Sequence, residues 1–486
     1  MLARNSLISM MASIVPVVVT IVTLPFLLNA IGLERYGALA LCWLILIYVG
    51  QADWGLGKAT THWVARTSAQ DPDAARGIMA SGIATALIVG SAMAALAGVI
   101  SWLFFAKFFD VDPALRTELL DSVWLIAAAT LATSILQVMY GALAGRERFA
   151  AASLAMMISN ASLPLLALAT ALLIDPGLEA LMMASLAGRL LGVLVAGSDI
   201  WMSQFRKQQI RLQFSDSRKL LKFGFWIMSA SFTAPILITI DRMIIGSKLG
   251  PAAVAAYTIP YQIVSRLQLV PQSLMNVLFP RLSVADQETA RKTSFFYAVT
   301  ISAMFLPIIV GLIFVLEPLL QLWLGSKLDD RSTLVGIVLL CAFLFAAIAQ
   351  STAVFLQSQN DGKFVAAFQF GEILPYVGLL TYAVAQGGLL GVAIVFLVRR
   401  VIETICFVAR SNYGNIRFWV TQIPAGLAIA SALFVEAQSD TLLSRIGAGT
   451  LIAIIAFVGA VFAAPSELRS LLTAQMQSRM PVFLRR

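Results

Sequence analysis

The sequence predicts an all-α polytopic membrane protein of about 14 transmembrane helices, with two parallel six-helix halves around a central cavity and two further C-terminal helices. Three observations predict this class. Long apolar runs recur from end to end, and hydrophobic residues make up 59% of the chain against 12% for charged residues. The basic residues concentrate on one side of these runs. Short segments repeat at a nearly constant spacing.

The apolar runs are each long enough to cross about 30 Å of hydrocarbon. The first, from about 6 to 30, is too long for the apolar region of a signal peptide and lacks a cleavage site, so we expect it to stay as a helix. We expect no soluble domain. The spans are predicted to centre near residues 18, 46, 92, 131, 162, 190, 233, 266, 306, 345, 374, 399, 427 and 453.

The Lys and Arg residues are divided unevenly between the two sides of the predicted spans. With the N-terminus inside, 22 of the 34 fall in cytoplasmic segments, 7 fall outside and five lie within spans. Cytoplasmic loops of membrane proteins carry such an excess. The distribution predicts an even number of spans with both ends cytoplasmic. It also accounts for the net charge of +9 without nucleic acid as a partner.

The internal repeat divides the chain. Matched pairs lie 211 to 219 residues apart: Gly32 with Gly250, Arg148 with Lys363, Gly177 with Gly388, and Pro16 with Pro235. A repeat of six helices enters the membrane from the same side each time, so the halves are parallel, as in transporters whose halves rock about a central site. The predicted segments are 1–210 and 211–412 for the halves, 413–464 for two extra helices and 465–486 for a basic cytoplasmic tail.

Five arginines lie inside the apolar runs, at positions 189, 242, 266, 399 and 400. A charge near the bilayer centre costs about 3 kcal/mol on insertion scales, so such residues usually face a cavity or a partner. Few acids share the membrane with them, which predicts a water-filled cavity with a cationic lining. Guanidinium groups match phosphate oxygens. The predicted ligand is therefore anionic, such as the phosphate of a lipid carrier.

The two adjacent arginines are expected to differ. Arg399 has Glu403 one turn on, and this i,i+4 pair predicts a structural role. Arg400 points about 100° away, so it is expected to be left without an acid and is predicted to be a phosphate ligand. The spacing of 211 residues between Arg189 and Arg400 places them in equivalent positions of the sixth and twelfth helices. They can therefore face each other across the cleft between halves.

The other arginines have different alternatives. Arg189 and Arg266 lie mid-span with no acid at helical spacing, so phosphate ligation competes with pairing to an acid on another helix. Arg242 lies near the outer end of its span, where snorkelling to the interface is the alternative.

Two acids are candidates for ion coupling. Glu372 is mid-span with no basic neighbour at helical spacing, so it either balances an arginine across the bundle or takes up a proton. Asp241 adjoins Arg242, and neighbours on a helix do not face each other. Aromatic residues that could stack on sugar rings are candidates for sugar contacts, with core or interface packing as the alternative. They are Tyr48, Trp54, Tyr257 and Tyr261.

Several classes of chemistry are not expected. His62 is the only histidine, and Cys42, Cys341 and Cys406 lie in apolar runs, which argues against a zinc site or disulfides. No Gly-x4-Gly-Lys-Ser/Thr sequence occurs, so direct ATP hydrolysis is not expected. We expect no metal, no cofactor and no enzymatic activity. Transport would then draw on an ion gradient, the membrane potential or removal of substrate.

The opening of the chain carries a recognisable pattern. A proline-bearing first helix is followed by Ile31-Gly32-x3-Tyr36-Gly37 and by a second helix that ends in Asp53-Trp54-Gly55-Leu56-Gly57. With the two-times-six-plus-two plan, the chain resembles the polysaccharide flippases of the multidrug, oligosaccharidyl-lipid and polysaccharide exporter superfamily.

The resemblance implies a fourteen-helix exporter fold with an alternating-access cavity in the inner membrane. The implied substrate is a polyprenyl-pyrophosphate-linked oligosaccharide that is turned to the outer leaflet for surface polysaccharide, lipopolysaccharide or exopolysaccharide synthesis. The lipid bilayer, a polysaccharide polymerase and the chain-length machinery are the implied partners.

Two alternatives stay open. The first is a cation-coupled exporter of drugs or metabolites from the same superfamily. Residues 6–30 hold no Asp or Glu, whereas the drug-extruding relatives often use an acid in the first helix for coupling. The second is a membrane glycosyltransferase or polymerase. The longest outside segments, 106–118 and 319–331, are short for a catalytic loop.

Overall fold

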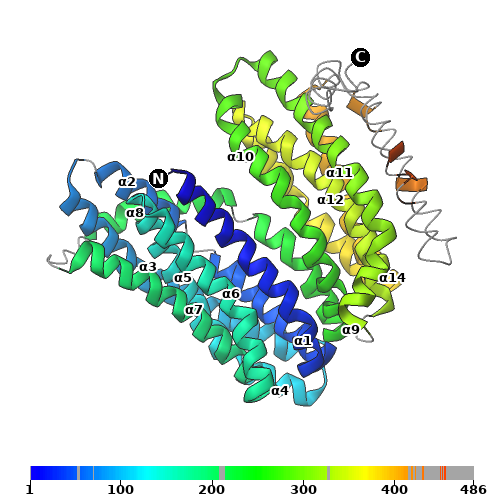
Figure 1. The fold of residues 1–486 in the computed structure, drawn as a ribbon, viewed down its shortest axis with the longest axis horizontal. Helices are drawn as coiled ribbons and strands as arrows, with labels where there is room; N and C mark the ends of the chain where they lie inside the picture. The colour runs from blue at the N-terminus through cyan, green and yellow to red at the C-terminus, as the bar shows by residue number, and fades with distance from the viewer. Residues whose placement is uncertain are drawn as a thin grey trace, which may run out of the picture. The chain divides into compact units, whose positions relative to one another are not determined.

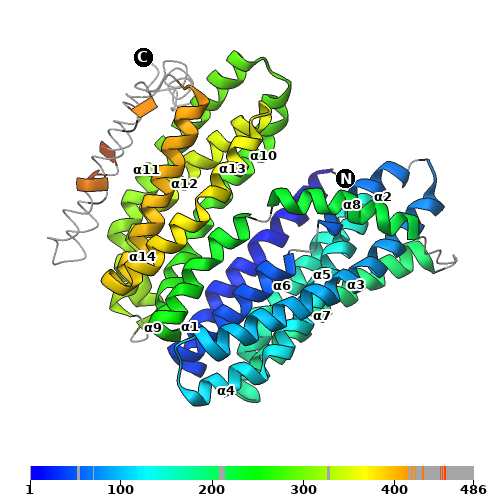
Figure 2. The same ribbon diagram turned by 180° about the vertical axis from the view of Figure 1, so that it is seen from behind.

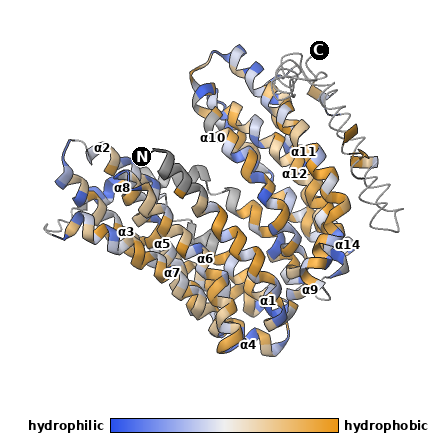
Figure 3. Ribbon diagram, in the orientation of Figure 1, coloured by the Kyte–Doolittle hydropathy of each residue, from blue (hydrophilic) through white to orange (hydrophobic). Residues whose placement is uncertain are grey.

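The computed structural model describes residues 2–51, 55–68, 70–206, 214–231, 233–325 and 329–413, together with a few short pieces between 418 and 455. The regular elements in these ranges are helices (Figure 1). Seven of the described helices are long and apolar enough to cross a membrane. Figure 3 shows hydrophobic residues along most of their lengths. The predicted helices near 427 and 453 and the tail 465–486 lie almost wholly outside the described residues.

The chain divides into two compact units, Met1–Ala255 and Ala256–Arg486. In unit 1, α6 packs against α1 and α7, and α3 packs against α5 (Figure 1, Figure 2). The helices of unit 1 are α1 (Leu2–Gln51), α2 (Leu56–Ser68), α3 (Pro72–Leu103), α4 (Pro113–Asp121), α5 (Val123–Gly145), α6 (Phe149–Leu173), α7 (Leu178–Ile200), α8 (Phe214–Ser231) and most of α9 (Thr233–Ser265).

In unit 2, α12 is the central helix, in contact with α10, α11 and α14. Its apolar sequence is almost wholly buried, so it forms the core of this unit. The helices are the end of α9, then α10 (Leu269–Val284), α11 (Gln287–Leu324), α12 (Asp330–Ser358), α13 (Gly362–Gly371) and α14 (Ile373–Ser411).

Glycines with positive φ break three of the long helices. Gly32 in α1 has φ 80° and ψ 170°, and Gly250 in α9 has φ 78° and ψ −179°. Gly388 breaks α14 with φ 55°. Only glycine adopts such angles without strain. The predicted span centres 18 and 46 therefore fall on opposite sides of Gly32, and 233 and 266 fall on opposite sides of Gly250.

Small residues bring the helices of unit 1 close together. A Cβ atom on Gly141 of α5 would collide with the carbonyl of Gly57 in α2. A Cβ atom on Gly192 of α7 would lie 2.6 Å from the Cβ of Ser159 in α6. Membrane helices commonly pack through such small residues. The close approach of α6 and α7 determines the surroundings of Arg189, which lies between these helices.

Candidate substrate-binding site

Arg189 is held between α6 and α7 in unit 1. Its Nη1 donates to Ser159 Oγ at 3.1 Å and to Asn160 Oδ1 at 2.9 Å. The residue is only 4% exposed. One turn earlier on α7, Ser185 accepts a hydrogen bond of 2.9 Å from the Trp43 indole of α1. The face of α7 that carries Arg189 is therefore polar although it lies inside an apolar bundle.

The charge of Arg189 has neutral partners only. Among the described residues, no carboxylate lies within 4.0 Å of its guanidinium, and its Nε has no hydrogen-bond partner. Buried charges are normally paired, because removing an ion from water costs several kcal/mol. Of the two predicted readings, a structural partner acid is not seen in this part of the chain. The arrangement therefore favours an anion that Arg189 can bind.

In unit 2, Arg399 pairs with Glu372. Arg399 Nη2 donates to Glu372 Oε1 at 2.8 Å, and the two side chains are 6% and 11% exposed. The guanidinium also lies over the Tyr376 ring, 4.8 Å from its centroid. The hydrogen-bonded acid is therefore Glu372, whereas the predicted partner Glu403 acts on Arg399 through its charge. The break at Gly388 brings the two limbs of α14 together, so an acid 27 residues away is closer than the one on the next turn.

Arg400 pairs instead with Glu403. Its Nη1 donates to Glu403 Oε2 at 2.7 Å, a pair at i,i+3 spacing. The prediction that Arg400 is left without an acid was therefore wrong, because residues three apart also share a helix face. Arg400 lies 5.2 Å from the Phe396 ring centroid. The Arg400 side chain keeps 17% exposure, so this cationic group remains accessible.

Arg242 is buried in α9. It is 2% exposed, and its Nη1 donates to the Ile238 carbonyl at 2.6 Å. Nη1 also lies 3.8 Å from Oδ1 of Asp241, which is fully buried. The snorkelling alternative is therefore wrong. The two neighbours do approach each other, because the Arg242 side chain turns back along the helix toward the preceding turn.

Arg266 is exposed, in contrast to the buried Arg189 and Arg242. It begins a single 3-10 turn between α9 and α10, and its side chain is exposed on unit 2. Two residues on, Gln268 Nε2 donates to the Phe343 carbonyl of α12 at 2.8 Å. This bond ties the turn to the core helix, so the position of Arg266 along the bundle is fixed.

The candidate aromatic residues separate into two groups. Tyr261 stacks on Tyr257, with centroids 6.2 Å apart, and contacts Phe343 and Phe396 edge-on at 5.5 and 6.1 Å. Tyr257 is fully buried, whereas Tyr261 is partly exposed. Through Phe396, this cluster adjoins Arg400. The side chain of Tyr48 and the whole of Trp54 lie outside the described residues.

The sequence reasoning missed several residues of these sites. Ser159 and Asn160 form a polar pair inside the apolar run of α6, a signal that could have identified the partners of Arg189. Phe343 and Phe396 have no such signal, because phenylalanine is common in apolar spans. Within the described residues, the structure shows no cluster of side chains that could hold a metal ion.

The fold matches solved membrane transporters. An inward-facing multidrug resistance MATE transporter of the MOP superfamily aligns with TM-score 0.69 and 17% identity, covering 83% of this chain and 98% of that chain. Lipid II flippase MurJ in an inward closed conformation aligns with TM-score 0.67 and 14% identity, covering 97% and 99%. The chain therefore has the fold of these two proteins, and its long apolar helices are those of a multi-pass membrane protein.

The sequence comparisons show the family. Residues 30–333 match the family described as polysaccharide biosynthesis protein, and the chain belongs to that family. A protein of Shigella flexneri named "Putative O-antigen transporter" is 24% identical over 414 residues, covering 83% of this chain and 96% of the relative. The predicted membership of the polysaccharide flippase and exporter family is confirmed.

Proposed function

We propose that this protein is a flippase that moves a polyprenyl-pyrophosphate-linked oligosaccharide across the inner membrane by alternating access, for surface polysaccharide biosynthesis. The observation that carries the proposal is Arg189, a buried arginine with neutral partners in the described part of a family member. A pyrophosphate supplies the anion that this guanidinium favours. The name of the Shigella flexneri relative, an O-antigen transporter, points to the same substrate class.

The pyrophosphate would bind the arginines, and the sugars would lie against aromatic residues. Arg189 would be the main pyrophosphate ligand. Arg400, Arg266 and Arg242 would bind the pyrophosphate at other stages of the cycle. Tyr261 is supported as a sugar contact by its partial exposure beside the Arg400 cluster. Tyr257, Tyr48 and Trp54 complete the set of proposed sugar contacts, and Tyr257 would require a rearrangement because it is buried here.

The transport cycle would alternate two six-helix halves, 1–210 and 211–412, followed by two helices in 413–464 and a cytoplasmic tail in 465–486. The matching backbone angles of Gly32 and Gly250, 218 residues apart, support this division. The excess of basic residues in alternate loops supports cytoplasmic termini. A polysaccharide polymerase and the chain-length proteins would receive the flipped product.

Glu372 is the proposed coupling residue. It neutralises Arg399 in this conformation. Protonation of Glu372 would remove the negative charge that neutralises Arg399, so proton uptake would be linked to a change of charge in this part of the bundle during the cycle. Asp241 beside Arg242 is a second such pair. Neither step needs a cofactor.

The proposal is tested by lipid analysis of a strain that lacks the protein and carries plasmid copies. We expect Arg189→Ala to accumulate polyprenyl-pyrophosphate oligosaccharide and to lose surface polysaccharide, with Arg189→Lys in between. Arg331→Ala is the matched control, because Arg331 is an exposed arginine paired with Asp329. Protein level and membrane insertion are measured in each strain.

Two outcomes would contradict the proposal. Normal lipid-linked sugars in the deletion strain, with raised sensitivity to cationic drugs, would favour the cation-coupled exporter. Full surface polysaccharide in the Arg189→Ala strain would remove the proposed phosphate site.

A further inference from the structure

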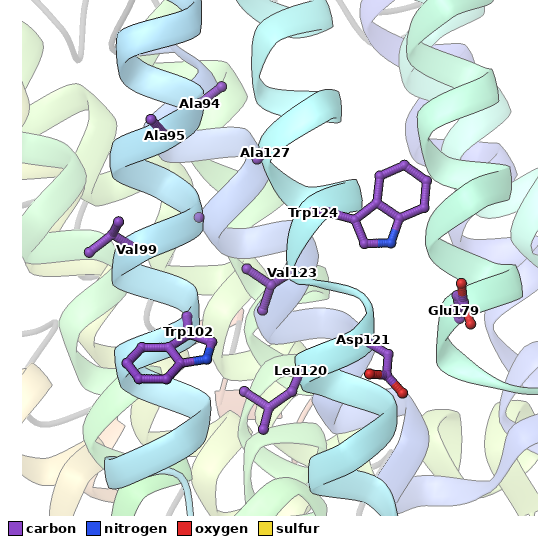
Figure 4. A pocket seen from close by; sticks show the side chains of 11 residues that line it. Ala94, Ala95, Val99, Trp102, Leu120, Asp121, Val123, Trp124, Ala127 and Glu179 are labelled. Atoms are coloured by element: carbon purple, nitrogen blue, oxygen red, sulfur yellow. The ribbon is translucent and has the colours of Figure 1, made fainter.

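A groove of about 710 Å³ lies on the surface of unit 1, away from Arg189. It runs between α3, the junction of α4 and α5, and the start of α7 (Figure 4). Its lining combines small apolar side chains with two tryptophans and two carboxylates: Ala94, Ala95, Gly98, Val99, Leu120, Val123 and Ala127, then Trp102 and Trp124, then Asp121 and Glu179.

The walls of the groove are suited to an acyl chain. The helices α3 and α5 carry small residues along the groove and pack closely there. A Cβ atom on Gly98 would lie 3.6 Å from the Cβ of Ala127. Val99 is 55% exposed on the same helix as Gly98. Exposed apolar side chains on membrane-spanning helices contact lipid. The groove is therefore a shallow, mostly apolar depression of ligand size on helices long and apolar enough to cross a membrane.

Two indoles line this groove, Trp102 from α3 and Trp124 from α5, on opposite sides of the start of α5 (Figure 4). Trp102 is 50% exposed and Trp124 is 56% exposed (Figure 4). Tryptophan is enriched where the hydrocarbon meets the lipid headgroups. Trp102 lies one residue before the end of α3, and Trp124 is the second residue of α5. The end of the groove that holds the indoles thus lies at headgroup depth.

The carboxylates lie at the same end. Asp121 is the last residue of α4, and Glu179 is the second residue of α7. In the ranges that the structure describes, neither forms an ion pair or accepts a hydrogen bond. Both side chains are exposed and line the same groove, so the groove presents two negative charges that repel each other. A cation between the two carboxylates would relieve this unfavourable arrangement.

We propose that the groove binds a phospholipid that carries a primary ammonium group. One acyl chain would lie along the small residues of α3 and α5. The ammonium would donate hydrogen bonds to Asp121 and Glu179 and would contact the indole face of Trp124. An anionic headgroup would be repelled by the same carboxylates. This site is separate from the proposed transport site and stands whether or not the protein moves lipid-linked sugar.

The test titrates the purified full-length protein in detergent with phosphatidylethanolamine or phosphatidylglycerol and counts bound lipids by native mass spectrometry. We expect one phosphatidylethanolamine to bind with a preference on the order of tenfold over phosphatidylglycerol. The double variant Asp121→Asn/Glu179→Gln should lose that preference. The matched control is Glu34→Gln/Asp112→Asn, which removes the same charge from two exposed acids outside the groove.

A second measurement does not depend on the stability of the charge variants. Phosphatidylethanolamine with brominated acyl chains should quench part of the tryptophan emission, and the double variant Trp102→Phe/Trp124→Phe should remove that part. The control is Trp201→Phe, because Trp201 is as exposed as Trp124 but lies at the other end of α7. This variant should keep the quenched part of the emission. Equal binding of the two lipids by the natural protein, or equal quenching by their brominated forms, overturns the proposal.

Discussion

Arg148 binds Asp199 through two parallel hydrogen bonds, Nε to Oδ2 at 2.8 Å and Nη2 to Oδ1 at 2.7 Å. The pair joins the loop after α5 to the end of α7. In unit 2, Arg410 Nε lies 2.6 Å from Asp361 Oδ2, and this pair joins the loop before α13 to the end of α14. The positions are 213 and 211 residues apart, within the repeat spacing, but acid and base have exchanged places.

The loops themselves repeat the same turn. Arg148 N donates to the Leu143 carbonyl at 2.9 Å, and Asp361 N donates to the Leu356 carbonyl at 2.9 Å. The residue before each has positive φ, 59° at Glu147 and 63° at Asn360. These matching turns support the proposed division into halves, because two unrelated loops would not be expected to share both the turn and the ion pair.

Exchanging the charges of the first pair should be tolerated. Arg148→Asp alone places two carboxylates together and should destabilise the protein, and the double variant Arg148→Asp/Asp199→Arg should recover most of the loss. Because Arg148 is partly exposed, the coupling is expected to be about 0.5–1 kcal/mol. Thermal unfolding of the purified single and double variants measures it. Additive losses in the double variant would contradict the predicted contact.

Variants of the Arg399–Glu372 ion pair can distinguish a role in stability from a role in transport. Glu372→Gln leaves the buried guanidinium without its carboxylate partner and should destabilise the protein by about 3 kcal/mol. The double variant Glu372→Gln/Arg399→Gln should regain stability because no buried charge remains at either position. If Glu372 couples transport to protons, that stable double variant should still lose the dependence of transport on the pH gradient. Reconstituted vesicles with and without a pH gradient measure this, and unchanged pH dependence excludes Glu372 as the coupling residue.

Asp329 should make the stability of unit 2 depend on acid pH. Its carboxylate accepts hydrogen bonds from the Arg331 guanidinium and from Arg331 N at the start of α12. The Arg331 hydrogen bond lowers the pKa of Asp329, so the folded state gains stability above the pKa of the unfolded chain and loses it as pH falls through the folded value. Asp329→Asn should cost about 1 kcal/mol near neutral pH and less below about pH 4. Thermal unfolding of the natural protein and of Asp329→Asn is measured from pH 3 to 7. A difference in melting temperature that stays constant over this range would contradict a stabilising role of the Asp329 carboxylate.

Gly32 should be intolerant of a side chain for reasons of backbone conformation alone. A Cβ atom there would have no neighbour within 4 Å, but φ is 80°. Gly32→Ala should therefore destabilise the protein by about 1 kcal/mol or more. Gly311→Ala is the matched control, because Gly311 lies inside α11, also has no neighbour within 4 Å of a Cβ atom, and gains helix propensity. Equal melting temperatures of the two variants would count against the broken-helix geometry.

Seven described helices are long and apolar enough to cross a membrane, and they contain the predicted centres 18, 46, 92, 131, 162, 190, 306 and 345, because apolar length is a direct physical requirement of the bilayer. The match of Gly32 to Gly250 was predicted as part of the repeat, and the structure shows that both glycines break a helix with similar backbone angles. The pairing of Arg399 was predicted only from the side of the acid: Glu372 was expected either to balance an arginine or to take up a proton, and its partner could not be named. The i,i+4 rule assumes a continuous helix, and the fold at Gly388 brings Glu372 closer than any neighbour on the next turn.

The site around Arg189 was predicted only in part. Its mid-span position identified the arginine, because charge in an apolar run is expensive. Its hydrogen-bond partners depend on which face of α6 meets α7, and Gly188 and Gly192 decide that by allowing close approach. Sequence spacing within one helix does not contain this information.

The neutral surroundings of Arg189 have an electrical consequence for the proposed cycle. An arginine that is held by a hydroxyl and an amide keeps its full positive charge, so the empty proposed site carries a positive net charge. Binding of an anionic substrate changes the net charge of the site. One elementary charge that crosses the whole membrane potential is worth about 2.3 kcal/mol per 100 mV. Loaded and empty carriers would therefore feel the cell's voltage differently, and the resting potential itself would give the flippase a direction.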